Sequence, residues 1–105
     1  MRLVILESPY AGDIERNIKY ARMCIKNSLS LGESPIASHL LYTQEGILDD
    51  TVPGERILGI RAGLAWLKVA EASVIYADYG ITSGMEQGAL AAQKQGLPIE
   101  YRRIL

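Results

Sequence analysis

Short apolar runs occur at intervals along the chain and predict its β-strands. Runs of this length that are rich in branched side chains are typical of strands buried on both faces of a parallel sheet. The run near residue 75 is the strongest of them, because β-branched and aromatic residues cluster there. The predicted strands are residues 2–6, 36–42, 73–77 and 99–102.

Between these runs, apolar residues recur every three or four positions, which predicts amphipathic helices. The expected helices lie over 13–31, around 57–67 and around 85–95. Asp13 is a suitable N-cap for the first of them, and Gly32 is a suitable residue to end it. Residues 43–54 show no period and form a long connection, of the kind that often binds ligands.

Strands and helices alternate in the order β-α-β-loop-α-β-α-β, which predicts the α/β class. We expect a small three-layer fold with a four-stranded, mainly parallel sheet in the flavodoxin-like order 2-1-3-4. The 105 residues suffice for one core, so we expect a single domain over 1–105.

Composition narrows the functional classes. The net charge of −1 argues against broad binding to nucleic acid, which needs a basic surface. One Cys and one His exclude a disulfide framework and a classical zinc site, and we expect no metal and no cofactor. The sequence shows no signal peptide and no apolar stretch of membrane-spanning length, so we expect a cytoplasmic protein without membrane contact.

Two polar loops follow predicted strands and carry the candidate chemistry. Open parallel sheets bind ligands beyond the carboxyl ends of their strands, and a helix N-terminus there favours an anion or a polar sugar. Neither loop matches a phosphate-binding or dinucleotide-binding glycine pattern. The candidate ligand-binding residues are Ser8, Pro9 and Gly12 in the first loop and Gly80, Thr82, Ser83 and Gly84 in the second.

Glu86 and His39 each have a structural and a functional interpretation. The stretch from Ser83 to Glu86 fits a capping box, in which Glu86 satisfies the start of its helix. Alternatively, the Glu86 carboxylate stabilises or attacks an electron-poor sugar carbon. His39 lies in an apolar run and is either a hydrogen-bonded structural residue or a ligand contact at the same edge of the sheet.

The segment Gly84-Met85-Glu86-Gln87-Gly88-Ala89-Leu90, shortly after an apolar strand, resembles the catalytic segment of nucleoside 2-deoxyribosyltransferases. The first strand with Ser8-Pro9-Tyr10-Ala11-Gly12 is similar to the opening of the same proteins. Their superfamily also contains deoxynucleoside-monophosphate N-glycosidases.

This resemblance implies catalytic roles for three residues. Glu86 matches the nucleophilic glutamate, Tyr10 the aromatic residue near it, and Asp78 a group that holds sugar or base. The family's proton-donating Asp has no counterpart in the helix around 57–67, and Asp49 or Asp50 is a possible substitute.

Two functions therefore remain open. The first is an enzyme that cleaves or exchanges the N-glycosidic bond of a nucleoside or its 5′-monophosphate through Glu86. The second is a binder that sequesters or senses a nucleotide-derived signal, such as a cyclic nucleotide or an ADP-ribose derivative, without turnover. In both cases we expect a homo-oligomer, a dimer or higher, with sites near the subunit contacts, because the small sheet leaves apolar edges.

Overall fold

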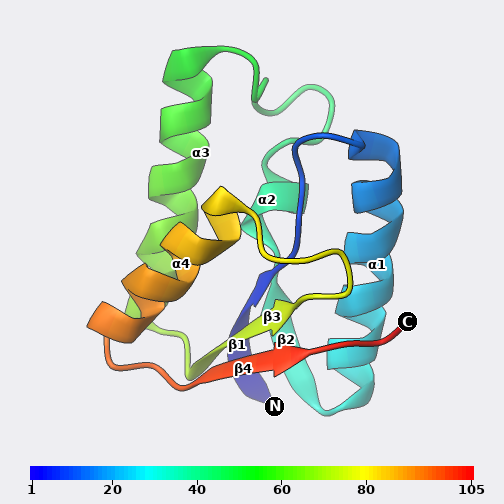
Figure 1. Ribbon diagram of the computed structural model, residues 1–105. Helices are drawn as coiled ribbons and strands as arrows, with labels where there is room; N and C mark the ends of the chain where they lie inside the picture. Colours follow the sequence, from blue (N-terminus) through cyan, green and yellow to red (C-terminus); the bar gives the residue numbers. More distant parts are fainter.

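A computed structural model describes all residues 1–105 and contains one parallel sheet (Figure 1). The strands lie in the order β2-β1-β3-β4, and all three neighbouring pairs are parallel. The predicted fold class and strand order are therefore confirmed. The elements are β1 (Arg2–Glu7), α1 (Ile14–Ser30), β2 (Glu33–Ile36), α2 (Ser38–Leu41), α3 (Pro53–Ala65), the 3-10 turn η1 (Trp66–Lys68), β3 (Ala72–Tyr76), α4 (Ser83–Lys94) and β4 (Ile99–Arg102).

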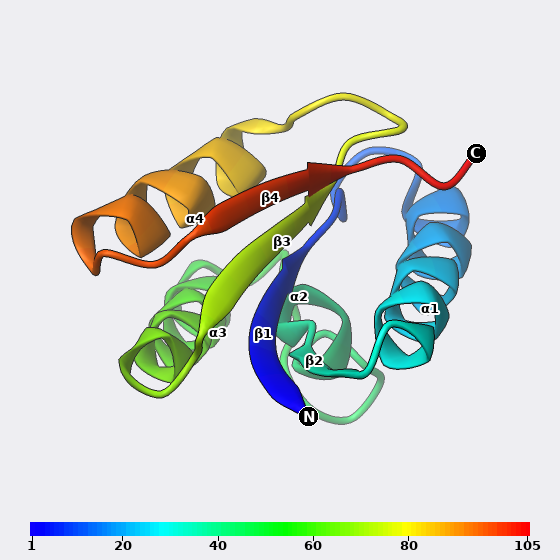
Figure 2. The same cartoon turned by 90° about the horizontal axis from the view of Figure 1, so that it is seen from below.

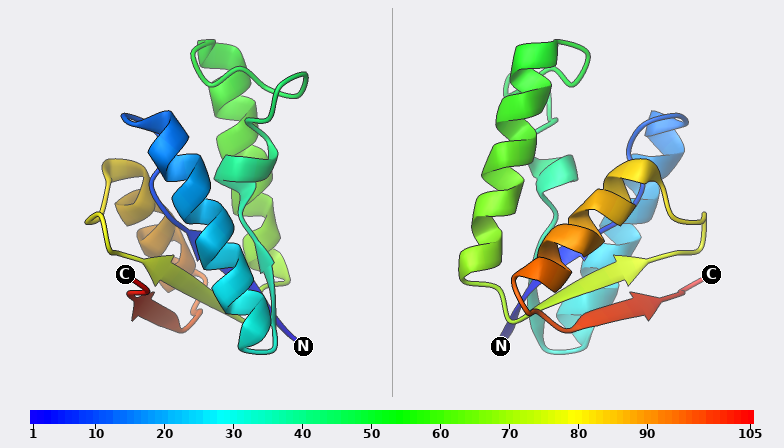
Figure 3. Two further views of the ribbon diagram at one scale, coloured as in Figure 1. Left: turned by 90° about the vertical axis from the view of Figure 1, so that its right-hand side faces the viewer. Right: turned by 60° about the vertical axis from the view of Figure 1, so that its left-hand side comes forward.

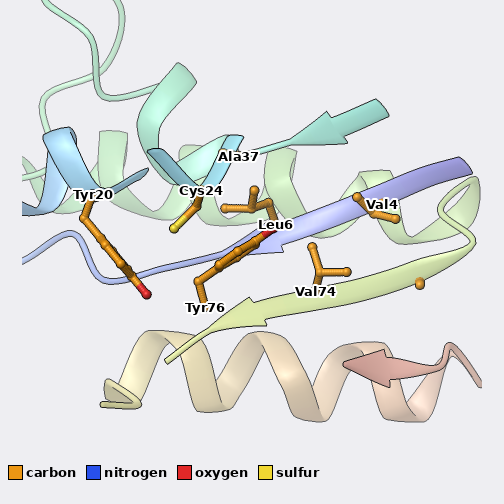
Figure 4. Close-up of a cluster of buried hydrophobic side chains, with 8 residues drawn as sticks. Val4, Leu6, Tyr20, Cys24, Ala37, Val74 and Tyr76 are labelled. Atoms are coloured by element: carbon orange, nitrogen blue, oxygen red, sulfur yellow. The ribbon is translucent and has the colours of Figure 1, made fainter. Parts of the chain in front are cut away.

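The sheet forms the middle of three layers. Viewed along the sheet, α1 lies against one face and α3 and α4 lie on the other (Figure 2). The larger core cluster is on the α1 side, where Tyr20 and Cys24 of α1 meet side chains of β1 and β3 (Figure 4). On the opposite face, Met85 and Ala89 of α4 cover Ile75 of β3. None of the helices combines the length and the apolar character needed to cross a lipid bilayer.

The prediction of a strand over residues 36–42 is wrong. β2 covers Glu33–Ile36, and the chain then turns into the short helix α2, held by the N–H groups of Leu40 and Leu41 on the Ala37 carbonyl. Apolar composition alone does not separate a short strand from one turn of helix. Pro35 lies inside β2, which is possible because β2 is an edge strand and needs no N–H donor on its outer side.

The helix predicted around residues 57–67 is present as α3, but its apolar side chains are not buried. No residue of α3 belongs to the buried core. Its start and the loop before it stand clear of the sheet on the side where the strands end (Figures 1 and 3). The exposed apolar residues of α3 are Ile57, Leu58, Ile60 and Leu64.

A polar network covers part of the sheet on the α1 side. Arg102 of β4 forms two hydrogen bonds of 2.7 Å to the carboxylate of Glu33, which is 4% exposed and belongs to β2 at the opposite edge. Ser28 of α1 also donates to Glu33. The Arg102 bonds hold the pKa of Glu33 below its usual value. Here ion pairs, rather than apolar contacts, join the two edges of the sheet.

Candidate functional site

The connections of β1 and β3 leave the sheet in opposite directions. β1 leads to α1 on one face, and β3, its neighbour, leads to α4 on the other (Figure 2). In open α/β sheets such a divergence marks where ligands bind, beyond the carboxyl ends of the two strands. We call this place, where Glu7 pairs in register with Ile75, the crevice. The two polar loops predicted from the sequence flank this crevice, residues 8–13 after β1 and 77–82 after β3.

A buried asparagine fixes the loop after β1. Asn17 of α1 is 1% exposed, and its Nδ2 donates to the carbonyl oxygens of Tyr10 at 2.9 Å and of Ala11 at 3.1 Å. Gly12 has a φ of +96°, which a residue with a side chain rarely adopts, and Asp13 then caps α1 as predicted. Sequence analysis missed Asn17, although a polar residue on the inner face of an amphipathic helix was a usable signal.

Ser8 and His39 meet at the base of this loop. The hydroxyl of Ser8 lies 2.6 Å from Nε2 of His39, and Ser8 is 5% exposed. His39 reaches it from α2 and not from a strand. Burial lowers the pKa of His39 to about 4, so the imidazole is neutral at physiological pH. The structure thus brings together two residues that were predicted independently.

Asp78 holds the start of the loop after β3. Its carboxylate accepts hydrogen bonds from the hydroxyl of Tyr20 at 2.5 Å and from the N–H groups of Ile104 and Leu105. Burial alone would raise the pKa of Asp78, but these hydrogen bonds outweigh it and hold the pKa below its usual value. Both carboxylate oxygens of Asp78 are therefore already hydrogen-bonded within the protein.

The same loop packs against the first turns of α1. The ring of Tyr79 meets the ring of Tyr20 edge to face, with centroids 4.7 Å apart. The guanidinium of Arg16 lies 4.0 Å from the centre of the Tyr79 ring. Gly80 reverses the chain with a φ of +84°, so this position favours glycine as Gly12 does.

Glu86 lies in the first turn of α4 and takes no part in capping it. The N-cap is Thr82, one residue earlier than predicted, and its hydroxyl accepts the N–H of Met85 at 3.2 Å. Met85 therefore occupies the position expected for the glutamate of a capping box, and that interpretation of Glu86 is wrong. Glu86 is exposed, and no hydrogen bond or ion pair engages its carboxylate.

The beginning of α4 offers further polar groups. The first N–H groups of a helix have no acceptor within it, which leaves those of Ser83 and Gly84 free. Gly84 has no close neighbour, because a Cβ there would meet only the hydroxyl of Thr82 at 4.0 Å. Thr82, Ser83 and Gly84 therefore lie together at the start of α4, after β3.

Glu7 is a carboxyl group that sequence analysis missed. It ends β1, and its side chain lies against α4 at Gly88, where an added Cβ would fall 2.2 Å from Oε2. Burial alone raises the pKa of Glu7 to about 7. An acidic residue that ends an apolar run, and so lies at the carboxyl edge of a central strand, was the available signal.

Asp49 and Asp50, in the loop before α3, are engaged by that loop and by the start of α3. Asp49 accepts hydrogen bonds from the N–H and hydroxyl of Thr51, which lower its pKa, and Asp50 pairs with Arg56 at 3.1 Å. No three His, Cys, Asp or Glu side chains gather closely enough to hold a metal ion.

Two surface recesses are lined by residues other than Glu7, Glu86 and the loop after β1. The larger, of about 500 Å³, opens at the end of β4, and the smaller, of about 320 Å³, lies between α1 and the segment after α2. The first is lined by Ala77, Ile81, Tyr101, Arg102 and Arg103, and the second by Ile18, Arg22, Leu40, Thr43, Gln44 and Glu45.

Comparison with known proteins gives a family and a fold. A solved structure of a 2-deoxyribosyltransferase from the psychrotolerant bacterium Bacillus psychrosaccharolyticus superposes with a TM-score of 0.67 and 15% sequence identity. The match covers 96% of this chain and 72% of that one, and at this identity it establishes a shared fold. No curated protein matches the sequence. The family model described as Domain of unknown function (DUF7768) matches residues 2–102, so the chain belongs to that family.

Proposed function

We propose that this protein binds a nucleoside or nucleoside 5′-monophosphate at the crevice and cleaves or exchanges its N-glycosidic bond through Glu86. The observation that carries the proposal is the free carboxylate of Glu86 in the first turn of α4, next to the loop after β3. The fold shared with a 2-deoxyribosyltransferase supports the same chemistry.

Glu86 suits nucleophilic attack on a sugar carbon. Cleavage of a glycosidic bond passes through a state with positive charge on the anomeric carbon, which a nearby carboxylate stabilises. An oxygen of Glu86 then bonds to C1′ as the bond to the base breaks. Water, or a second base, afterwards displaces the resulting ester and restores the carboxylate.

The surrounding groups provide binding and alignment. The free N–H groups of Ser83 and Gly84 suit a sugar hydroxyl or a 5′-phosphate. Tyr10 lies on the loop that Asn17 fixes across the crevice. We assign Asp78 a positioning role, because it anchors the loop leading to α4 while both of its oxygens are occupied.

Incubation with a panel of nucleosides, deoxynucleotides and cyclic or ADP-ribose-type nucleotides tests this function. Chromatography follows the compounds before and after heat denaturation. We expect free base with the wild type and with Glu15→Gln, a control whose carboxylate is exposed on α1, and none with Glu86→Gln. Full activity in Glu86→Gln would contradict the mechanism. A compound that disappears on mixing and returns intact on heating would instead identify a binder.

We also propose that a second copy of this chain covers α3. Four large apolar side chains on this helix are between 43% and 57% exposed, and a two-fold contact would bury the same surface on both copies. Light scattering tests this, with Leu58→Glu expected to shift the protein to smaller assemblies. A monomeric wild type at working concentration would contradict the proposal.

A further inference from the structure

The carboxyl group of Glu7 has no partner in the protein. No hydrogen bond or ion pair engages it, and burial is the single cause that raises its pKa. Its oxygens are also not sealed in, because the only side-chain oxygen that is both fully enclosed and unpaired is that of Ser73. A largely buried carboxyl that keeps contact with solvent is available to a ligand.

Gly88 creates the place that this carboxyl occupies. A Cβ at that position would come within 2.2 Å of Oε2 and 2.8 Å of Cδ of Glu7, so any other residue there would force the Glu7 side chain to move. Glu7 ends the central strand β1, at the crevice between β1 and β3. The carboxyl is therefore held at the site by the strand and by the helix that carries Glu86.

The Glu7 carboxyl meets α4 close to Glu86. Its contact is at Gly88, two residues after Glu86, so both carboxyls lie at the first two turns of the helix. Residues two positions apart lie about 200° apart around a helix axis, so a substrate that both groups serve would lie across the N-terminal end of α4.

We propose that Glu7 is the general acid and base of the site, a role that rests on the function proposed above. In the first step the C1′–N bond breaks, its electron pair passes to the base, and Glu7 donates its proton to a nitrogen of the base while Glu86 bonds to C1′. In the second step Glu7 takes a proton from water, the water oxygen bonds to C1′, and the ester bond to Glu86 breaks.

No charged group near Glu7 pairs with its carboxyl, so the carboxyl is free to give up and take back a proton. Glu86 is the nearest titratable residue along α4, and His39 of α2 is bonded to Ser8, the residue after Glu7. On β3, the register partner is the uncharged Ile75. A carboxyl with a pKa of about 7 has both of its protonation states present at neutral pH, as an acid that must be regenerated requires.

Two substrates separate the role of Glu7 from that of Glu86. A neutral deoxynucleoside needs a proton on its leaving base, whereas a 2-deoxyribosyl pyridinium salt releases neutral pyridine without one. We follow release of the leaving group in the first turnover, before water attacks the ester. We expect Glu7→Gln to slow this release from the neutral nucleoside by about 10²–10⁴-fold and to leave release of pyridine within a few-fold of the wild type, while later turnovers slow for both substrates. Glu86→Gln should cleave neither substrate, and Glu15→Gln should cleave both as the wild type does.

The outcomes are distinguishable. If Glu86→Gln loses both substrates while Glu7→Gln matches the wild type on the neutral nucleoside, the proposed function stands and the role of Glu7 falls. Equal slowing of first-turnover release from both substrates in Glu7→Gln also overturns that role. If the wild type cleaves neither substrate, both proposals fall.

A titration of the wild type provides a readout without turnover. NMR of the ¹³C-labelled glutamate carboxyls, with the Glu7 signal assigned by its absence in Glu7→Gln, should show a midpoint near 7. A midpoint in the ordinary range near 4.5 would overturn the proposal. If the variant does not fold, the wild-type spectrum still decides, because a glutamate midpoint near 7 is either present or absent.

Discussion

The hydroxyl of Tyr20, in the middle of α1, donates a 2.5 Å hydrogen bond to the carboxylate of Asp78, and it accepts the N–H of Asp78 in return. This double contact ties the loop after β3 to the helix on the α1 side. Asp78 was predicted to hold a ligand, but its carboxylate oxygens are instead hydrogen-bonded to Tyr20 and to backbone N–H groups. The crevice is thus bounded on one side by a loop whose position a buried tyrosine sets.

Removing the tyrosine hydroxyl should loosen this loop. In Tyr20→Phe we expect a loss of about 1–3 kcal/mol, the usual cost of leaving a buried group unpaired. Asp78→Asn should cost a similar amount, because the tyrosine and two backbone N–H groups lose a charged acceptor. Chemical denaturation of both variants and the double variant checks this. Additive losses would show that the two residues are not coupled.

Gly88 and Gly84 should respond oppositely to alanine. In Gly88→Ala the new Cβ meets the flexible end of the Glu7 side chain, which must move, so we expect a loss of up to about 1 kcal/mol. In Gly84→Ala the Cβ has room, so its effect on stability should be neutral or a gain of up to about 1 kcal/mol from helix propensity. Thermal melts compare the two. Combining Gly88→Ala with Glu7→Ala should recover stability, and failure to do so would exclude a clash with Glu7.

Glu7 should make the protein less stable as the pH rises. Its folded-state pKa is raised from 4.5 to about 7, so the folded state holds a proton that the unfolded state has released between these values. The contribution of Glu7 to the free energy of unfolding is complete below pH 4.5 and is lost as the pH rises past 7. The shift corresponds to about 3 kcal/mol. Unfolding of Glu7→Gln should lack this decline, and parallel pH profiles would contradict it.

His39 should act in the opposite direction at lower pH. Its folded-state pKa is lowered from 6.5 to about 4, so the unfolded state binds the proton first. Its contribution is complete above pH 6.5 and is lost as the pH falls toward 4. Urea midpoints between pH 4 and 6.5 should therefore drop more steeply in the wild type than in His39→Gln. In that interval the effects of Glu7 and His39 partly cancel.

The ion pair between the sheet edges should respond strongly to loss of one partner. Arg102→Ala leaves the carboxylate of Glu33 buried without its two 2.7 Å bonds, which typically costs about 3–5 kcal/mol. Lys19→Ala, which breaks an exposed pair with Glu15 on α1, should cost less than about 0.5 kcal/mol. Equal effects in denaturant would show that burial of the pair does not matter.

Sequence patterns predicted the sheet better than the site. β4 has the predicted bounds, and α1 begins after its predicted cap, because both signals are local. The burial of Glu7 depends on Gly88, a residue far along the chain, and no local pattern contains that contact. The occupation of Asp78 likewise depends on Tyr20 and on backbone groups at residues 104 and 105.

The polar bridge from Glu33 to Arg102 has a consequence for how the sheet opens. Edge strands usually fray first, and their amide hydrogens exchange through local openings. Here β2 and β4, the two outermost strands, hold each other across the central pair. Neither can peel away without exposing a buried charge. We therefore expect amide exchange in both outer strands to require unfolding of the whole sheet, so that the scaffold beneath the crevice opens as one cooperative unit.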